Sequence, residues 1–210
     1  RLAYYFSGNF LGQDGSLRHA TDRKNRYTVN AKINAKLTDW ANMMYNMRFA
    51  RTDYSAPTFL SEDNDVFYHN MVRYWPIIPV TDPNGHYTGP SGIEQLKNGG
   101  QYETQDDVLA HQFALRLTPL KGWLINVELN YRTTNTFRHT DWLTTYYYDA
   151  LNKPRVLNNN VSSVQEYAYK SNYFNPNIYS EYSHSLGDHN FKVMAGYQSE
   201  WYRYRNVTGK

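Results

Sequence analysis

The chain has 210 residues, with 22 lysines and arginines against 19 aspartates and glutamates, a net charge of +3 and no cysteine. The absence of cysteine from these 210 residues excludes a disulfide scaffold, a thiolate metal site and a cysteine nucleophile within them. The small net charge, with no basic run beyond residues 23–26, does not favour nucleic-acid binding.

Aromatic residues make up 17% of the chain and include 21 tyrosines. Such amphipathic rings suit membrane interfaces, carbohydrate contacts and protein interfaces. Mean hydropathy is −0.78, so no stretch approaches a membrane-spanning helix. A transmembrane barrel stays compatible with this value, because only every second residue of its strands faces lipid.

The most regular predicted strand covers residues 26–37 (RYTVNAKINAKL) and follows a weaker candidate at residues 2–11. One side carries Tyr27, Val29, Ala31, Ile33, Ala35 and Leu37, and the other carries Thr28, Asn30, Lys32, Asn34 and Lys36. Successive side chains of a strand point to opposite faces, so this strand has one apolar and one polar side. Alternation over about ten or more residues is typical of strands that cross an outer membrane, whereas soluble strands more often have about five or six.

Further runs with the same alternation follow along the chain. They begin at Met43, His111, Trp123 and Phe191, and residues 174–185 form a weaker candidate. Together the runs predict about seven strands.

The connections between these strands alternate between short and long. Turn-rich links are expected at residues 38–40, 119–122 and 186–189, and long loops at about residues 12–25, 54–107 and 138–170. Outer-membrane barrels combine brief periplasmic turns with extended extracellular loops. The pattern predicts an all-β, antiparallel up-and-down sheet that forms part of a large transmembrane β-barrel and spans residues 1–210.

The polar faces of the strands indicate a water-filled lumen. The residues expected to line it are Asn30, Lys32, Lys36, Arg48, Arg116 and Arg132. The main alternative is a soluble carbohydrate-binding β-sandwich, in which Tyr27, Leu115 and Val127 would be buried between two sheets. An outer-membrane enzyme and a simple porin are further alternatives.

The long loops carry turn, helix and aromatic signals. Residues 82–85 (DPNG) predict a type I turn, and residues 91–98 predict a short helix capped by Ser91 and closed near Gly99. The loop aromatics expected to contact a ligand or partner are Trp75, Tyr87, Trp142, Tyr146, Tyr147 and Tyr148. The alternative is that these rings pack the loops against one another.

Catalytic and metal-binding motifs do not support an enzyme. There is no H-E-x-x-H, G-x-S-x-G, P-loop or G-x-G-x-x-G sequence. His184 and His189 flank a turn at a spacing that matches no strong metal motif, and the acidic run at residues 62–65 is better explained as a solvated loop. No catalytic residue, metal or cofactor is therefore expected.

Three segments resemble the SusC/RagA-like TonB-dependent transporters. They are residues 4–15 (YYFSGNFLGQDG), residues 74–76 (YWP) with residues 82–87 (DPNGHY), and residues 189–200 (HNFKVMAGYQSE). The first resembles a strand-to-loop segment of that family, the second an extracellular loop and the third a barrel strand.

The resemblance implies a barrel of roughly 22 strands with a plugged lumen, in the outer membrane of a Gram-negative bacterium. It also implies import of oligosaccharides or peptides, with a SusD-like surface lipoprotein over the mouth and energy from a TonB complex acting through a plug region. The 210 residues contain neither a plug nor a TonB box, so we expect them to be a middle portion of a longer protein. Seven strands cannot close a barrel, so we also expect a curved sheet with two open edges.

Overall fold

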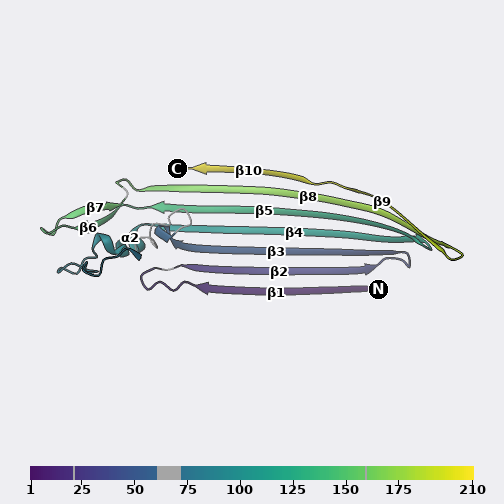
Figure 1. Cartoon of the computed structure of the whole chain (residues 1–210), viewed down its shortest axis with the longest axis horizontal. Helices are drawn as coiled ribbons and strands as arrows, with labels where there is room; N and C mark the ends of the chain where they lie inside the picture. The colour runs from purple at the N-terminus through teal and green to yellow at the C-terminus, as the bar shows by residue number, and fades with distance from the viewer. Residues whose placement is uncertain (21, 61–71, 159) are drawn as a thin grey trace.

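The computed structural model of the chain describes residues 1–20, 22–60, 72–158 and 160–210, and its main feature is one long antiparallel wall (Figure 1). The wall strands, in the order in which they pair, are β1 (Leu2–Asp14), β2 (Arg23–Lys36), β3 (Ala41–Pro57), β4 (Gln101–Leu120), β5 (Trp123–Trp142) and β8 (Ser163–Leu186). β9 (His189–Gln198) and β10 (Trp201–Gly209) both pair with β8.

β9 and β10 together make one wall strand. β9 pairs with residues 177–186 of β8, and β10 pairs with residues 166–174 of the same strand. At the break between them, the Ser199 N–H donates to the Pro176 carbonyl at 3.2 Å. The described residues thus form an eight-stranded, antiparallel, up-and-down sheet with seven positions across the wall. This agrees with the roughly seven strands that the alternation predicts, and the all-β fold is confirmed.

Tight turns lie at one end of the wall and long loops at the other (Figure 1). The turns follow β2, β4 and β8, and the last two consist of residues 121–122 and 187–188. The predicted loop limits were too wide, because β3 continues to Pro57, β4 already begins at Gln101 and β8 begins at Ser163. Hydrophobic alternation ends where neither face needs an apolar surface, but the backbone ladder continues without it.

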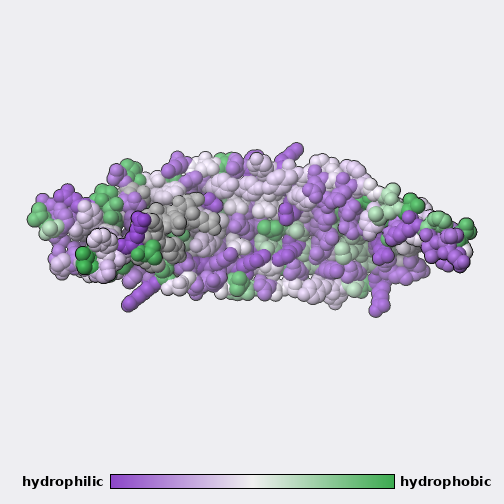
Figure 2. All heavy atoms as spheres, in the orientation of Figure 1, coloured by the Kyte–Doolittle hydropathy of each residue, from purple (hydrophilic) through white to green (hydrophobic). Residues whose placement is uncertain are grey.

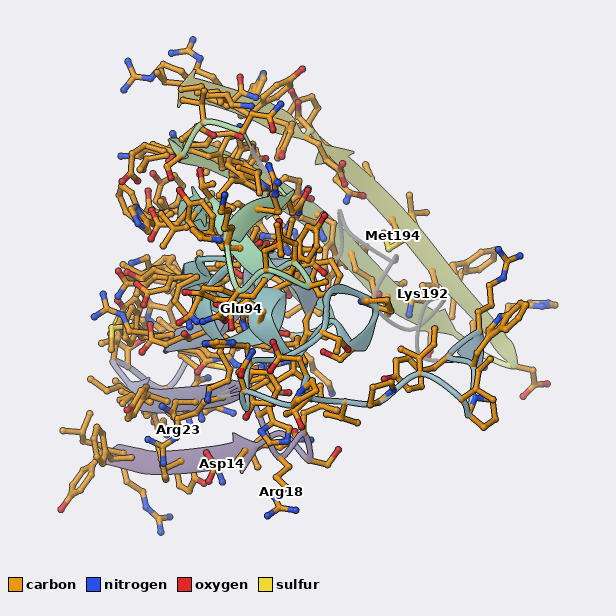
Figure 3. All side chains as sticks on the ribbon, turned by 90° about the vertical axis from the view of Figure 1, so that its left-hand side faces the viewer. Asp14, Arg18, Arg23, Glu94, Lys192 and Met194 are labelled. Atoms are coloured by element: carbon orange, nitrogen blue, oxygen red, sulfur yellow. The ribbon has the colours of Figure 1, made fainter. Side chains whose placement is uncertain are left out.

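The wall has no second sheet packed on it among the described residues. The accessible surface is 14650 Å², against roughly 10,000 Å² for a compact globular protein of this mass. Tyr27, Ile33 and Ile178 keep 43%, 38% and 41% of their surface exposed. This argues against the sandwich, in which the same face would be covered. Figure 3 looks from the loop end and shows an open, twisted wall with β1 at the bottom and β10 at the top.

The loops form a small packed cap at their end of the wall. It contains η1 (Thr58–Leu60), η2 (Gly89–Ser91), α2 (Ile93–Asn98) and the hairpin of β6 (Thr145–Tyr148) and β7 (Pro154–Asn158). Its core is Phe59 against Leu96, with Leu17, Ala20 and Leu60 packed around them. The cap is tied to the wall, because the Thr58 hydroxyl donates to the Asp141 carbonyl at 2.6 Å.

The predicted helix is confirmed, but its start differs. α2 begins at Ile93 behind Gly92, which has a left-handed φ of 68°, so Ser91 is not the cap residue. Ser91 lies one residue before the cap residue Gly92, and its hydroxyl accepts the Ile93 N–H at 3.4 Å. The C-terminal end is as predicted, with the Gly99 N–H donating to the Gln95 carbonyl at 2.9 Å.

The predicted turn at residues 82–85 is also confirmed, with the Gly85 N–H donating to the Asp82 carbonyl at 3.0 Å. His184 and His189 lie beside the two-residue turn between β8 and β9. The acidic run at residues 62–65 lies outside the described residues. Within the described chain, no helix is long and apolar enough to cross a membrane.

Candidate transport surface and loop cap

The pairing register divides the wall into two faces. Residues directly opposite each other on antiparallel strands project to the same side. One continuous row across five strands is Tyr4, Ile33, Tyr45, Phe113 and Leu129. The adjacent row towards the tight turns contains Met43, Leu115, Val127, Ile178 and Tyr197. These two rows are apolar, and the apolar band to which they belong also contains His111 and Ser180 in the neighbouring rows.

Aromatic side chains mark both limits of this apolar band. Trp123 lies opposite Tyr182 near the tight turns. At the other limit, Phe174 stacks on Trp201 with ring centroids 5.5 Å apart, beside Tyr131. On β5 the band runs over residues 123–131, or about 26 Å along the strand at ~3.3 Å per residue. Outer-membrane barrels carry an apolar band about 25 Å tall, flanked by such aromatic girdles.

The position at which the apolar band ends shifts along the strand direction from one strand to the next. The first polar residue beyond it is Asn25 on β2, Arg51 on β3, Asp107 on β4, Thr133 on β5 and Asn172 on β8. In the register, Thr133 and Asn172 lie one row nearer the tight turns than Arg51 and Asp107. A membrane plane crosses the rows obliquely in this way when the strands are tilted.

The opposite face is polar and carries all six residues predicted to line the lumen. Asn30 is directly opposite Arg48, and Lys32 lies one row away on the same strand. Lys36 and Arg116 share the row through Asn42 nearer the tight turns. Figure 2 shows one face of the molecule on which hydrophilic shades dominate the middle of the wall.

Two arginines flank a small residue in the middle of this polar face. Arg48 lies opposite Ala110, which lies opposite Arg132, which lies opposite Tyr173. The guanidinium of Arg132 sits 5.3 Å from the centre of the Tyr173 ring, and a recess of about 290 Å³ opens over the row. Neither Arg48 nor Arg132 forms an ion pair with a carboxylate of the described residues.

Sequence reasoning missed a group of tyrosines on the same polar face. They are Tyr167, Tyr169, Tyr173, Tyr202 and Tyr204 on β8 and β10. The hydroxyls of Tyr169 and Tyr202 hydrogen bond at 2.5 Å, and Arg138 lies 5.5 Å from the Tyr167 ring. The alternate tyrosines at 167 and 169 were a visible signal, but their partners on β10 come from much later in the chain.

Amide side chains hold this polar surface in a fixed arrangement. The Asn130 amide donates to Asn175 at 3.4 Å, and Asn175 donates to the Ser199 carbonyl at 2.9 Å. Asn126 donates to Glu128 at 2.8 Å. Asn126 and Asn175 are both only 7% exposed. These hydrogen bonds give the largely buried amides of the polar face the partners that buried polar groups need.

Of the predicted loop contact residues, Tyr87 and Tyr148 pack within the cap. Tyr148 stacks on His86 with ring centroids 3.8 Å apart, and the Lys97 ammonium lies 5.1 Å from the Tyr87 ring. Tyr146 and Tyr147 lie on β6, next to Tyr148 and opposite β7.

The two predicted tryptophans have different surroundings. Trp75 is 65% exposed, and Trp142 ends β5 with the Lys210 ammonium 5.0 Å from its ring. Of the six residues, Tyr146, Tyr147 and Tyr148 are brought together on β6. Among the described residues, no group of three or more His, Asp or Glu side chains is placed to hold a metal ion.

An aspartate organises the tip of the β6–β7 hairpin. The Asp149 carboxylate accepts the Lys153 N–H at 3.0 Å, the Arg155 guanidinium at 2.9 Å and the Leu151 N–H at 2.9 Å. The Lys153 bond, followed by those of Arg155 and Leu151, outweighs partial burial and lowers the pKa of Asp149. This tip is therefore ordered by an ionised carboxylate.

A two-faced wall of long, up-and-down strands with turns at one end and a loop cap at the other is the architecture of a segment of an outer-membrane β-barrel. The fold and the two faces define that class of structure. The up-and-down strand order also agrees with the fold predicted from the sequence.

Comparison with solved structures gives the same class. The chain superposes on the RagAB peptide importer in its 'open-open' state with a TM-score of 0.74 and 16% sequence identity, over 99% of this chain and 23% of the matched chain. For the 'closed-closed' state the TM-score is 0.71 at 16% identity, over 99% and 24%. The chain thus has the fold of part of that importer's barrel and spans about a quarter of the matched chain. No family model and no curated relative matches the sequence.

Proposed function

We propose that this chain is part of the wall and extracellular mouth of an outer-membrane, TonB-dependent importer. In this proposal the apolar band faces lipid and the polar face lines the lumen. The loop cap lies outside the cell, where a SusD-like lipoprotein closes the mouth. Transport consists of binding, rearrangement of a plug under TonB and release, with no covalent chemistry.

The observation that carries the proposal is the separation of the two faces over seven strands. One face has the five-strand row from Tyr4 to Leu129 with no charge, and the other has Arg48 and Arg132 on either side of Ala110. A soluble protein would leave the first face in water at a large hydrophobic cost. In a bilayer the same face is matched to its surroundings.

The substrate proposed is a polar oligomer, either a peptide or an oligosaccharide. Peptide import is supported by the shared fold with the RagAB peptide importer and by Arg48 and Arg132, whose guanidinium groups suit carboxylates. Oligosaccharide import is supported by the tyrosines of β8 and β10, whose rings offer flat faces next to hydroxyl groups.

The test uses the full-length protein in its own outer membrane. A strain without the gene is compared with the wild type for uptake of labelled peptide mixtures and of labelled oligosaccharides. We expect loss of accumulation of one of these two classes, and loss of the same uptake when the proton gradient is collapsed. Unchanged uptake of both classes would refute import, and uptake that survives collapse of the gradient would indicate a simple porin.

Partnership is tested separately by purifying the full-length protein in mild detergent. A surface lipoprotein should copurify in a fixed ratio, and removal of the loop cap should release it. Recovery of the protein from the soluble fraction without detergent would refute the membrane assignment.

A further inference from the structure

Three cations gather on the apolar-band side of β8 and β10. Lys170 on β8 is directly opposite Arg205 on β10, and Arg203 lies two residues from Arg205 on the same face. All three side chains are exposed. Across the described ranges, none of them forms an ion pair. Like charges directly opposite one another destabilise a sheet, so a bound anion would stabilise this arrangement.

Other cations on this face, in contrast, are paired with carboxylates. Arg51 makes two hydrogen bonds of 2.7 Å with Asp107, and Arg23 bonds to Asp14 at 2.8 Å. Glu166, the carboxylate of β8 on this face, is bonded to His139 at 2.5 Å. Asp14, Asp107 and Glu166 of this face are thus engaged by partners other than Lys170, Arg203 and Arg205.

The cluster lies at the loop-end limit of the apolar band. Phe174 and Trp201 form the aromatic row that ends the band, and Asn172 opposite Arg203 is the next row. Asn172 accepts hydrogen bonds from Tyr131 and Thr133 at 3.0 Å through its oxygen, and its side-chain NH2 group is a hydrogen-bond donor. A lipid whose chains cover the band would have its headgroup at this height.

We propose that Lys170, Arg203 and Arg205 bind the phosphate of a lipid headgroup in the outer leaflet, an inference that rests on the proposed barrel function. Arginine forks bind phosphate oxygens bidentately and lysine adds a point charge. The acyl chains of the same lipid would lie along the apolar band below Phe174 and Trp201. Binding therefore needs both parts of the molecule, phosphate and hydrocarbon.

The test uses the full-length protein in nanodiscs of phosphatidylcholine containing lipid A with two phosphates. Bound lipid A is counted by native mass spectrometry as its fraction in the disc is varied. The test variant replaces Lys170, Arg203 and Arg205 with glutamine. The control replaces Lys32, Lys36 and Arg116 with glutamine, which removes the same charge from the polar face.

We expect lipid A binding to weaken on the order of 100-fold in the test variant, since each cation near a lipid surface contributes roughly fivefold. The control should bind like the wild type, and lipid A without phosphates should not be retained. Equal binding by test and control variants would overturn the site. Competition by inorganic phosphate at the concentration of the lipid would overturn the lipid as its ligand.

These outcomes are separate from failure of the proposed function. A protein that enters nanodiscs but shows no difference between the variants refutes only the lipid site. A full-length protein that stays in solution without entering the discs refutes the barrel wall and the lipid site together.

Discussion

Placing an arginine on the apolar band should be far more harmful than placing one on the polar face of the same strand. Leu115 on β4 lies in the row of Met43 and Val127, and Val127 is the midpoint of the β5 span of residues 123–131. An arginine at the bilayer midplane of a barrel costs about 2–4 kcal/mol. Leu115→Arg should therefore lower the folding equilibrium constant about 30- to 700-fold.

The matched control is Gln112→Arg, three residues away on the same strand. Gln112 lies on the polar face, opposite Asn46 and Asn130, so its replacement should change stability by less than about 0.5 kcal/mol. The assay is urea unfolding of the full-length protein in phospholipid vesicles, followed by tryptophan fluorescence. Equal midpoints for the two variants would refute the assignment of the faces.

Three further predictions concern the turn, the hairpin and the polar face. Gly122 has a φ of 83°, and an added Cβ would lie 2.2 Å from the Ser183 carbonyl oxygen. Gly122→Ala should therefore lower the free energy of unfolding by about 1–3 kcal/mol in the same urea assay. An unchanged midpoint would contradict the left-handed conformation of this turn. The pKa of Asp149 is lowered in the folded hairpin, so its contribution to stability is present above the ordinary aspartate value of 3.8 and is lost as pH falls below it. Hydrogen exchange at the Lys153 amide, corrected for intrinsic rates, should therefore lose protection below about pH 4, but Asp149→Asn should abolish that pH step. Arg132→Gln should weaken binding of an anionic peptide by about 5- to 10-fold, measured by calorimetry, without moving the urea midpoint; unchanged affinity would remove Arg132 from the transport surface.

The wall could be predicted from the sequence because its signal is local. The alternation over residues 26–37 needs only the period of a strand, and the register then places Asn30 and Lys32 on one face and Ile33 on the other. The turn at residues 82–85 was equally local, since its geometry depends on proline and glycine at fixed positions. These features were predicted correctly.

The strand ends and the tyrosine surface could not be predicted in the same way. β3 and β4 continue beyond the predicted limits because backbone pairing needs no apolar face, so hydrophobic alternation gives no sign of it. Tyr169 and Tyr202 meet only because β10 pairs with β8. The stack of His86 on Tyr148 likewise joins two separate loops, and it depends on how the cap folds.

The most direct test of the two-faced wall is a cysteine scan along β4 with spin labels. The 210 residues contain no cysteine, so single cysteines can be placed one at a time at residues 112–117 of a full-length protein that is free of other cysteines. Collision rates with oxygen, which dissolves in lipid, and with a water-soluble nickel complex are then measured in vesicles.

We predict that residues 113, 115 and 117 are accessible to oxygen and protected from nickel, and that residues 112, 114 and 116 show less oxygen access. Protection of the first set from both reagents would place it between two sheets. Nickel access at the first set would place it in water. Either of these results would contradict a wall with lipid on one side.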